Sequence, residues 1–138
     1  MLRLSIAALS CLLLVAHVWA DDKEEAAKKE QEKFQGEWKL AGQDEVSLKI
    51  TGAEYLFTLG DMKEKGKMKF NPAAKPNEVD VEITEGTDMG RKQVGIYEWK
   101  GDKVKFCFAK AGEAKRPDKF EASDDGSLIL FEFEKVKK

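Results

Sequence analysis

The chain has 138 residues, a length that suits one domain built around a single hydrophobic core. Its 24 basic and 26 acidic residues leave a formal net charge of −2. A surface this nearly balanced has no general attraction for nucleic acid or anionic lipid, and no basic patch is interleaved with aromatic residues. We therefore expect no nucleic-acid partner.

Residues 1–20 have the pattern of a cleaved secretion signal. Arg3 gives a positive start, residues 4–18 are mostly apolar, and Ala20 supplies the small residue at the cleavage position. The apolar run is too short to span a membrane and is followed at once by the charged residues 21–25. We expect an exported protein without a membrane span, located in the periplasm or outside the cell.

Cleavage after Ala20 would remove both Cys11 and His17, leaving Cys107 as the one cysteine and no histidine. The exported protein could then form no internal disulfide, so packing alone would hold the fold. Zinc, copper and haem sites need histidines or several cysteines, and we expect no metal and no cofactor. An alternative for Cys11 is lipidation, because the residues before it faintly resemble a lipoprotein signal.

Residues 21–33 are predicted to form a charged helix or spacer. The segment is rich in Ala, Glu, Lys and Gln and contains no Gly, Pro or β-branched residue. Asp22 can cap the helix, with Glu25 three positions later. Its apolar side consists only of Ala26, Ala27 and, further on, Phe34, which is typical of a surface helix or a partly ordered spacer and not of a core element.

Residues 34–138 are predicted to form an all-β domain. Apolar side chains recur at every second position and are separated by Gly-Asp or Asp-Gly turns, a pattern typical of antiparallel strands with one buried face. About eight or nine short strands of this kind favour a lipocalin-like up-and-down barrel, with a β-sandwich as the alternative. The alternating groups are Trp38/Leu40, Val46/Leu48/Ile50, Val79/Val81/Ile83, Val104/Phe106/Phe108 and Ile129/Phe131/Phe133.

Several local motifs within residues 33–135 resemble a family of small exported, lipocalin-like domains of unknown function that is abundant in planctomycete bacteria. The resemblance implies a barrel fold and an address outside the cytoplasm, but no activity and no catalytic residues. Lipocalin-type barrels commonly place an Arg of the last strand over the first-strand Trp, whereas this chain offers Lys135 and Lys137. The motifs are Phe34-Gln35-Gly36-Glu37-Trp38, Asn71-Pro72, Lys75-Pro76 with Val79-Asp80-Val81, Gly95-Ile96-Tyr97-Glu98, Gly101-Asp102, Lys105-Phe106-Cys107-Phe108-Ala109, and Arg116-Pro117 with Phe120.

Catalytic patterns are weak. Without a histidine, no serine and no cysteine of the exported protein has the usual base of a nucleophilic site. Asp80 and Glu82 share one face of a strand at a spacing that a glycosidase could use, but acidic pairs are inevitable in so acidic a chain, and the simple interpretation is a solvated strand face. The run 124–126 is too short for an EF-hand and suits a turn, with adventitious Ca²⁺ at the acidic loop 118–125 left open. An enzyme of unknown type is therefore our third choice.

The candidate ligand site is the barrel interior, formed by Trp38, Tyr55, Phe57, Phe106 and Phe108 with Arg116 near the mouth. All eight Phe and both Tyr remain after cleavage, which favours a filled interior, but an eight-stranded barrel can also hold one small ligand. We expect a non-enzymatic module that binds a small apolar or amphipathic ligand. The alternative is a structural or protein-interaction component of the cell envelope with a filled barrel.

Two further residues, Arg116 and Cys107, allow more than one interpretation. Arg116, beside Pro117, could bridge backbone carbonyls at the barrel mouth with its planar guanidinium or bind a ligand carboxylate or phosphate there. Cys107 alternates with the inward Phe106 and Phe108 and should point outward. It is either covered by the N-terminal helix or a loop, or it is an exposed thiol open to oxidation.

Overall fold

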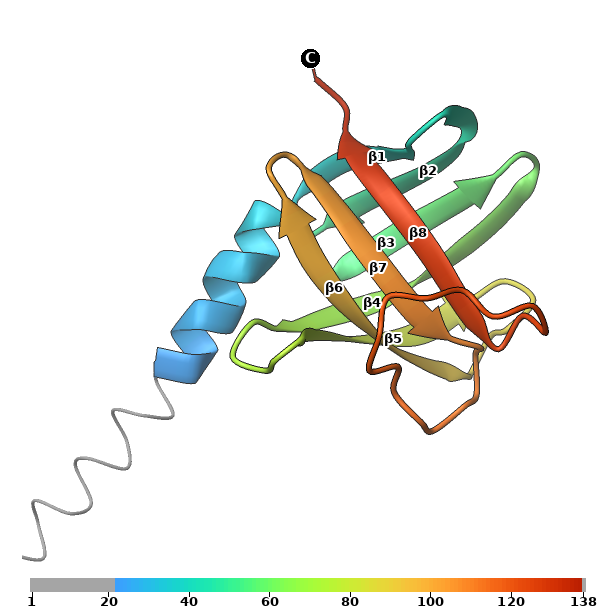
Figure 1. The fold of residues 1–138 in the computed structure, drawn as a ribbon. Helices are drawn as coiled ribbons and strands as arrows, with labels where there is room; N and C mark the ends of the chain where they lie inside the picture. The colour runs from blue at the N-terminus through green and yellow to red at the C-terminus, as the bar shows by residue number, and fades with distance from the viewer. Residues whose placement is uncertain (1–21, 138) are drawn as a thin grey trace, which may run out of the picture.

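A computed structural model describes residues 22–137 as one helix, residues 22–33, followed by eight strands (Figure 1). The predicted all-β barrel with one short N-terminal helix is confirmed, and the sandwich alternative is wrong because the sheet closes on itself. The secretion signal predicted for residues 1–20 lies outside the described residues. The strands are β1 (Gly36–Leu40), β2 (Gln43–Thr51), β3 (Glu54–Leu59), β4 (Met62–Asn71), β5 (Asn77–Glu85), β6 (Lys92–Lys100), β7 (Lys103–Ala109) and β8 (Leu128–Lys135).

Each strand pairs antiparallel with the next one in sequence, and β8 pairs with β1 to complete the barrel. The tight turns rely on glycines at positions that need a positive φ, such as Gly52 and Gly101, both at 62°. Because all neighbours are sequential, the alternating apolar residues of every strand converge on one interior.

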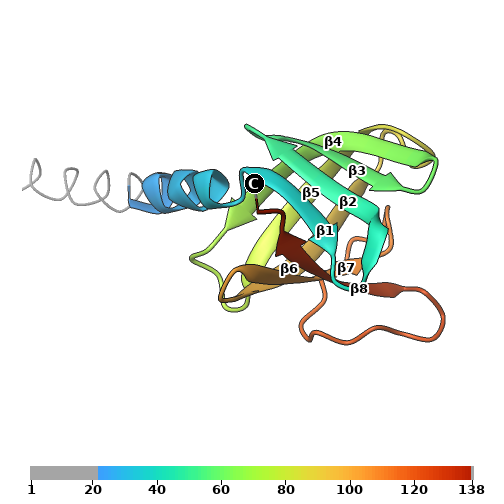
Figure 2. The same cartoon turned by 90° about the horizontal axis from the view of Figure 1, so that it is seen from above.

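The two ends of the barrel differ. The end that we call the helix end carries the N-terminal helix, the short turns after β2 and β6, and the last residues of β8. The opposite end, the loop end, carries residues 86–91 and the long segment 110–127. Figure 1 shows the helix running away from one end of the barrel, and Figure 2 shows the same arrangement from above.

Aromatic rings fill the helix end. The side chain of Phe34 is 0% exposed, and its ring stacks on Phe70 with centroids 3.9 Å apart. Trp99 and Tyr97 lie 4.5 and 5.2 Å from the Phe34 ring. Most side chains of residues 22–33 are exposed, as expected for a surface helix, but Phe34, which the sequence grouped with the thin apolar side of this helix, is a core residue. It closes this end of the barrel.

The β1–β8 seam carries a cation over a tryptophan. Trp38 is the register partner of Lys135, and the Lys135 Nζ lies 5.5 Å from the centroid of the Trp38 ring. The indole Nε1 donates a hydrogen bond to the Phe34 carbonyl at 2.9 Å. Lysine therefore takes the place over Trp38 where the resemblance implied an arginine, and the same tryptophan connects the seam to the plug at Phe34.

Candidate functional site

The loop end of the barrel contains an open cavity of about 190 Å³. Its floor and walls are mostly apolar, contributed by alternating inward positions of the strands, while polar side chains stand among them towards the loops. The lining residues are Leu48, Tyr55, Phe57, Glu64, Met68, Val81, Asp88, Gln93, Phe106, Phe108, Lys110, Ala111, Ile129, Phe131 and Phe133.

Two strand glycines let aromatic rings lie close to the barrel wall. A Cβ added at Gly66 would come within 2.7 Å of Cε1 of Tyr55, and one at Gly95 within 2.5 Å of Cδ1 of Phe108. Each ring occupies the space that a side chain at the paired position of the neighbouring strand would fill in an ordinary barrel wall. A side chain at either glycine would also meet backbone atoms, the carbonyl oxygen of Glu82 at Gly66 and that of Cys107 at Gly95, so both the ring and the backbone around it would have to shift.

Glu64 is the charged residue with the closest connection to this aromatic wall. It takes an inward position on β4, is partly buried, and accepts a hydrogen bond from the Tyr55 hydroxyl at 2.9 Å. Burial raises the pKa of the Glu64 carboxyl, and the nearby Asp88 carboxylate raises it further, against the opposing effect of the Tyr55 hydrogen bond. Burial, together with Glu64, also raises the pKa of the Tyr55 phenol well above its ordinary value.

Neighbouring charges leave Glu64 without a salt-bridge partner. Asp88 is paired with Arg91, whose Nη1 lies 3.5 Å from its Oδ1. Lys110 lines the cavity too, but its side chain is exposed at the rim. Among residues 22–137, no lysine or arginine nitrogen lies within ion-pair distance of the Glu64 carboxylate. The cavity thus combines aromatic walls with a carboxylate that lacks a countercharge.

Four of the six residues predicted for the site line this cavity. Tyr55 and Phe57 reach it from β3, and Phe106 and Phe108 from β7. Trp38 does not belong to the lining: it lies in the aromatic cluster at the helix end and is 1% exposed.

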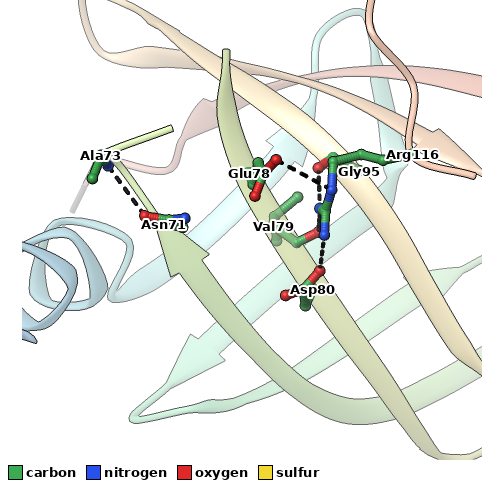
Figure 3. Close-up of polar contacts among 7 residues, drawn as sticks. All are labelled: Asn71, Ala73, Glu78, Val79, Asp80, Gly95 and Arg116. Atoms are coloured by element: carbon green, nitrogen blue, oxygen red, sulfur yellow. Dashed lines mark hydrogen bonds and ion pairs between the residues drawn. The ribbon is translucent and has the colours of Figure 1, made fainter. Parts of the chain in front are cut away.

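Arg116 lies on the outer wall of the barrel and not at the mouth, where the sequence analysis expected it. Its guanidinium Nη1 donates to the carbonyls of Val79 and Gly95 at 3.1 and 2.9 Å, and Nη2 donates to Asp80 Oδ1 at 2.6 Å (Figure 3). Its Nε lies 3.5 Å from a carboxylate oxygen of Glu78. The guanidinium therefore bridges carbonyls of β5 and β6 and fastens segment 110–127 to the barrel.

The same segment covers Cys107. The thiol points outward from β7, is 0% exposed, and lies 3.6 Å from the Glu121 carbonyl, to which it donates. Its register partner on β6, Ile96, also points outward and is 1% exposed, and Pro117 is buried on the segment itself. Of the two alternatives for Cys107, the covered side chain is the one observed, and burial raises the pKa of its thiol.

Glu64 was not among the residues predicted for the site, although its strand position marks it as inward. With Met68 and Phe70 turned inward, the two-residue period of a strand places Glu64 on the same face. A carboxylate in the inward phase of a barrel strand is unusual enough to mark a site. Asp80, by contrast, is an exposed residue held by Arg116, and its neighbour Glu82 is exposed on the same outer face.

Between residues 22 and 137, no group of three or more His, Cys, Asp or Glu side chains is placed to hold a metal ion. In that same range, no helix is long and apolar enough to cross a membrane. Fold and site define a small up-and-down β-barrel with an open, mostly apolar cavity. Comparison of the chain with family models, curated proteins and solved structures found no match.

Proposed function

We propose that this protein is an exported, non-enzymatic binding module that takes a small apolar or amphipathic molecule into the loop end of its barrel. The open cavity among Tyr55, Phe57, Phe106 and Phe108 carries this proposal. Concave sites with mostly apolar walls and a few polar groups are the usual form of small-molecule sites.

The size of the cavity limits the ligand. Apolar cavities of about 150 Å³ accept a molecule the size of benzene. The present cavity, at about 190 Å³, is therefore matched to one ring or to the end of a short chain, with more of the ligand free to extend through the mouth. The helix end offers no further room, because the rings around Phe34 fill it.

Binding is favoured over catalysis by the groups present. The lining of the cavity contains no serine, threonine, cysteine or histidine. The Tyr55 phenol lies next to the Glu64 carboxylate, but burial raises its pKa and keeps it protonated, which makes it a weak nucleophile. The one thiol of the described chain, Cys107, lies on the opposite side of the β7 strand, under segment 110–127.

Titration with a ring-sized neutral probe, benzyl alcohol, tests this function. We expect saturable changes in the amide NMR signals of β3, β7 and β8, confined to residues around the cavity. Ala111→Phe should weaken these changes by filling the mouth, since Ala111 is part of the lining. The matched control Ala73→Phe adds the same ring at an exposed site at the helix end and should leave binding unchanged. Absence of saturable shifts in the wild-type protein would refute the proposal.

The second candidate is a structural or protein-interaction component of the cell envelope. The aromatic cluster at the helix end favours it, since packed rings already fill that end of the interior. Native mass spectra recorded after incubation with cell-envelope lipid extract separate the two candidates. A stoichiometric small adduct that Ala111→Phe abolishes supports binding, whereas an unliganded mass in every extract supports the structural role.

Export is a separate part of the proposal and has its own test. Expression of the full chain in a bacterial host should yield an exported protein whose intact mass is that of a chain beginning at Asp21. A lipidated species that begins at Cys11 would support the alternative, and retention of the uncleaved chain in the cytoplasm would contradict export.

A further inference from the structure

Glu64 sets the polarity of the cavity. Its carboxylate stands on β4 beside the Tyr55 hydroxyl, in a space whose other walls include the rings of Phe57, Phe108 and Phe131. Taking a carboxylate out of water is costly unless a positive charge or several hydrogen bonds compensate for it. Glu64 is partly buried, and the Tyr55 hydroxyl donates a hydrogen bond to it at 2.9 Å, but no positive charge of the described chain pairs with it.

The charges that face Glu64 strengthen this polarity. Asp88, from the loop after β5, adds a second negative charge whose own partner is Arg91. Tyr55, from β3, is neutral at physiological pH, because a phenol ordinarily ionises only near pH 10 and burial raises its pKa further. Lys110, just after β7, is the cation of the lining, but its side chain is exposed and therefore well solvated. The inner part of the cavity is thus suited to a positive charge.

We propose that the ligand is a small amphipathic amine, whose ammonium group binds the Glu64 carboxylate while its ring or short chain packs among Phe57, Phe108 and Phe131. This inference rests on the proposed function and names the ligand class of the same cavity. A charge-assisted hydrogen bond from the ammonium would supply the missing partner of Glu64. The faces of the surrounding aromatic rings also attract cations, which adds to the preference.

Three probes of equal size test the inference: benzylamine, benzyl alcohol and benzoate, each titrated into the full protein at neutral pH and followed by amide NMR shifts. Benzylamine should bind at least about tenfold more tightly than benzyl alcohol, and benzoate most weakly of the three. Binding of benzoate ahead of benzylamine would assign the polar contact to Lys110 and overturn the inference.

Glu64→Gln removes the charge while leaving an oxygen that can still accept the Tyr55 hydrogen bond. In this variant the advantage of benzylamine over benzyl alcohol, with both affinities measured on the same variant, should disappear. The matched control Glu82→Gln removes the same charge from the exposed outer face of β5 and should keep the advantage. An advantage that persists in Glu64→Gln would overturn the inference.

The pH dependence provides a second readout. Because the pKa of Glu64 is raised, lowering the pH from neutrality protonates this carboxyl before an ordinary glutamate, and benzylamine binding should weaken while benzyl alcohol binding stays constant. Equal affinities of benzylamine and benzyl alcohol for the wild-type protein at neutral pH would refute the amine preference and leave the proposed function standing. Failure of all three probes to bind would refute both the amine preference and the proposed function.

Discussion

Replacing Phe34 by alanine tests the packing at the helix end. The Phe34 side chain is fully buried and contacts the rings of Phe70, Trp99 and Tyr97, with the nearest centroid at 3.9 Å. Truncating a buried phenylalanine costs about 3–5 kcal/mol, because apolar burial is lost and a cavity is left behind. We expect Phe34→Ala to fall in this range, since the stacked and edge-on ring contacts around Phe34 are lost as well.

Thermal and urea unfolding of the purified variants measure this loss. For a domain of this size, about 3–5 kcal/mol corresponds to a decrease in Tm of roughly 10–20 °C. Phe131→Ala is the matched control, because it deletes the same side chain at the open loop end, where the ring is only partly buried. We expect it to cost about half as much or less, because the ring already borders solvent.

The comparison of the two variants shows whether the helix end is more tightly packed than the loop end. A loss below about 1 kcal/mol in Phe34→Ala, or equal losses in both variants, would contradict a barrel that is solid at the helix end and hollow at the loop end.

The remaining predictions concern titration, the covering segment and the seam. Tyr55 and Tyr97 are the two tyrosines of the chain, and burial raises the pKa of both. The phenolate absorbance of the native protein should therefore rise at a higher pH than that of the unfolded chain. The free energy of unfolding should fall as the pH increases above about 10, because the tyrosines of the unfolded chain ionise first. Coincident titration curves of the native and unfolded protein would contradict this. Arg116→Lys should lose about 1–3 kcal/mol and speed the reaction of Cys107 with a thiol reagent, since a single ammonium cannot bridge both carbonyls; unchanged labelling would show that other contacts hold segment 110–127. Lys135→Ala should lower the free energy of unfolding measured in urea by about 0.5–1 kcal/mol. A stability equal to wild type would show that the Lys135 ammonium over the Trp38 ring does not stabilise the seam.

Much of the fold could be predicted from the two-residue rhythm of apolar side chains. The period shows which side chains share a face, and turns such as that at Gly101 show where strands reverse, so a sequential antiparallel sheet followed directly. The role of Phe34 could not be predicted in this way. It follows a charged helix with little apolar surface, and its partners, Phe70 and Trp99, are far away in the sequence.

The site was predictable in part for the same reason. Tyr55 and Phe108 are inward by period, so their place in the interior follows from their strands alone. Which end of the barrel stays hollow depends on how the barrel closes and on which side chains fill the other end. For this reason the sequence could not show that Trp38 lies in the filled helix end, apart from the predicted residues that line the cavity. The position of Arg116 depends on how segment 110–127 folds back over β5 and β6, for which a loop sequence carries no periodic signal.

Xenon bound in crystals of the protein would show directly whether the barrel is hollow at the loop end and filled at the helix end, since the anomalous signal of this atom locates apolar space that is open to a small guest. We expect xenon in the loop-end cavity near Phe57, Phe108 and Phe131, and none among the rings around Phe34. Xenon at the helix end, or a loop end closed by collapsed side chains and free of xenon, would contradict it.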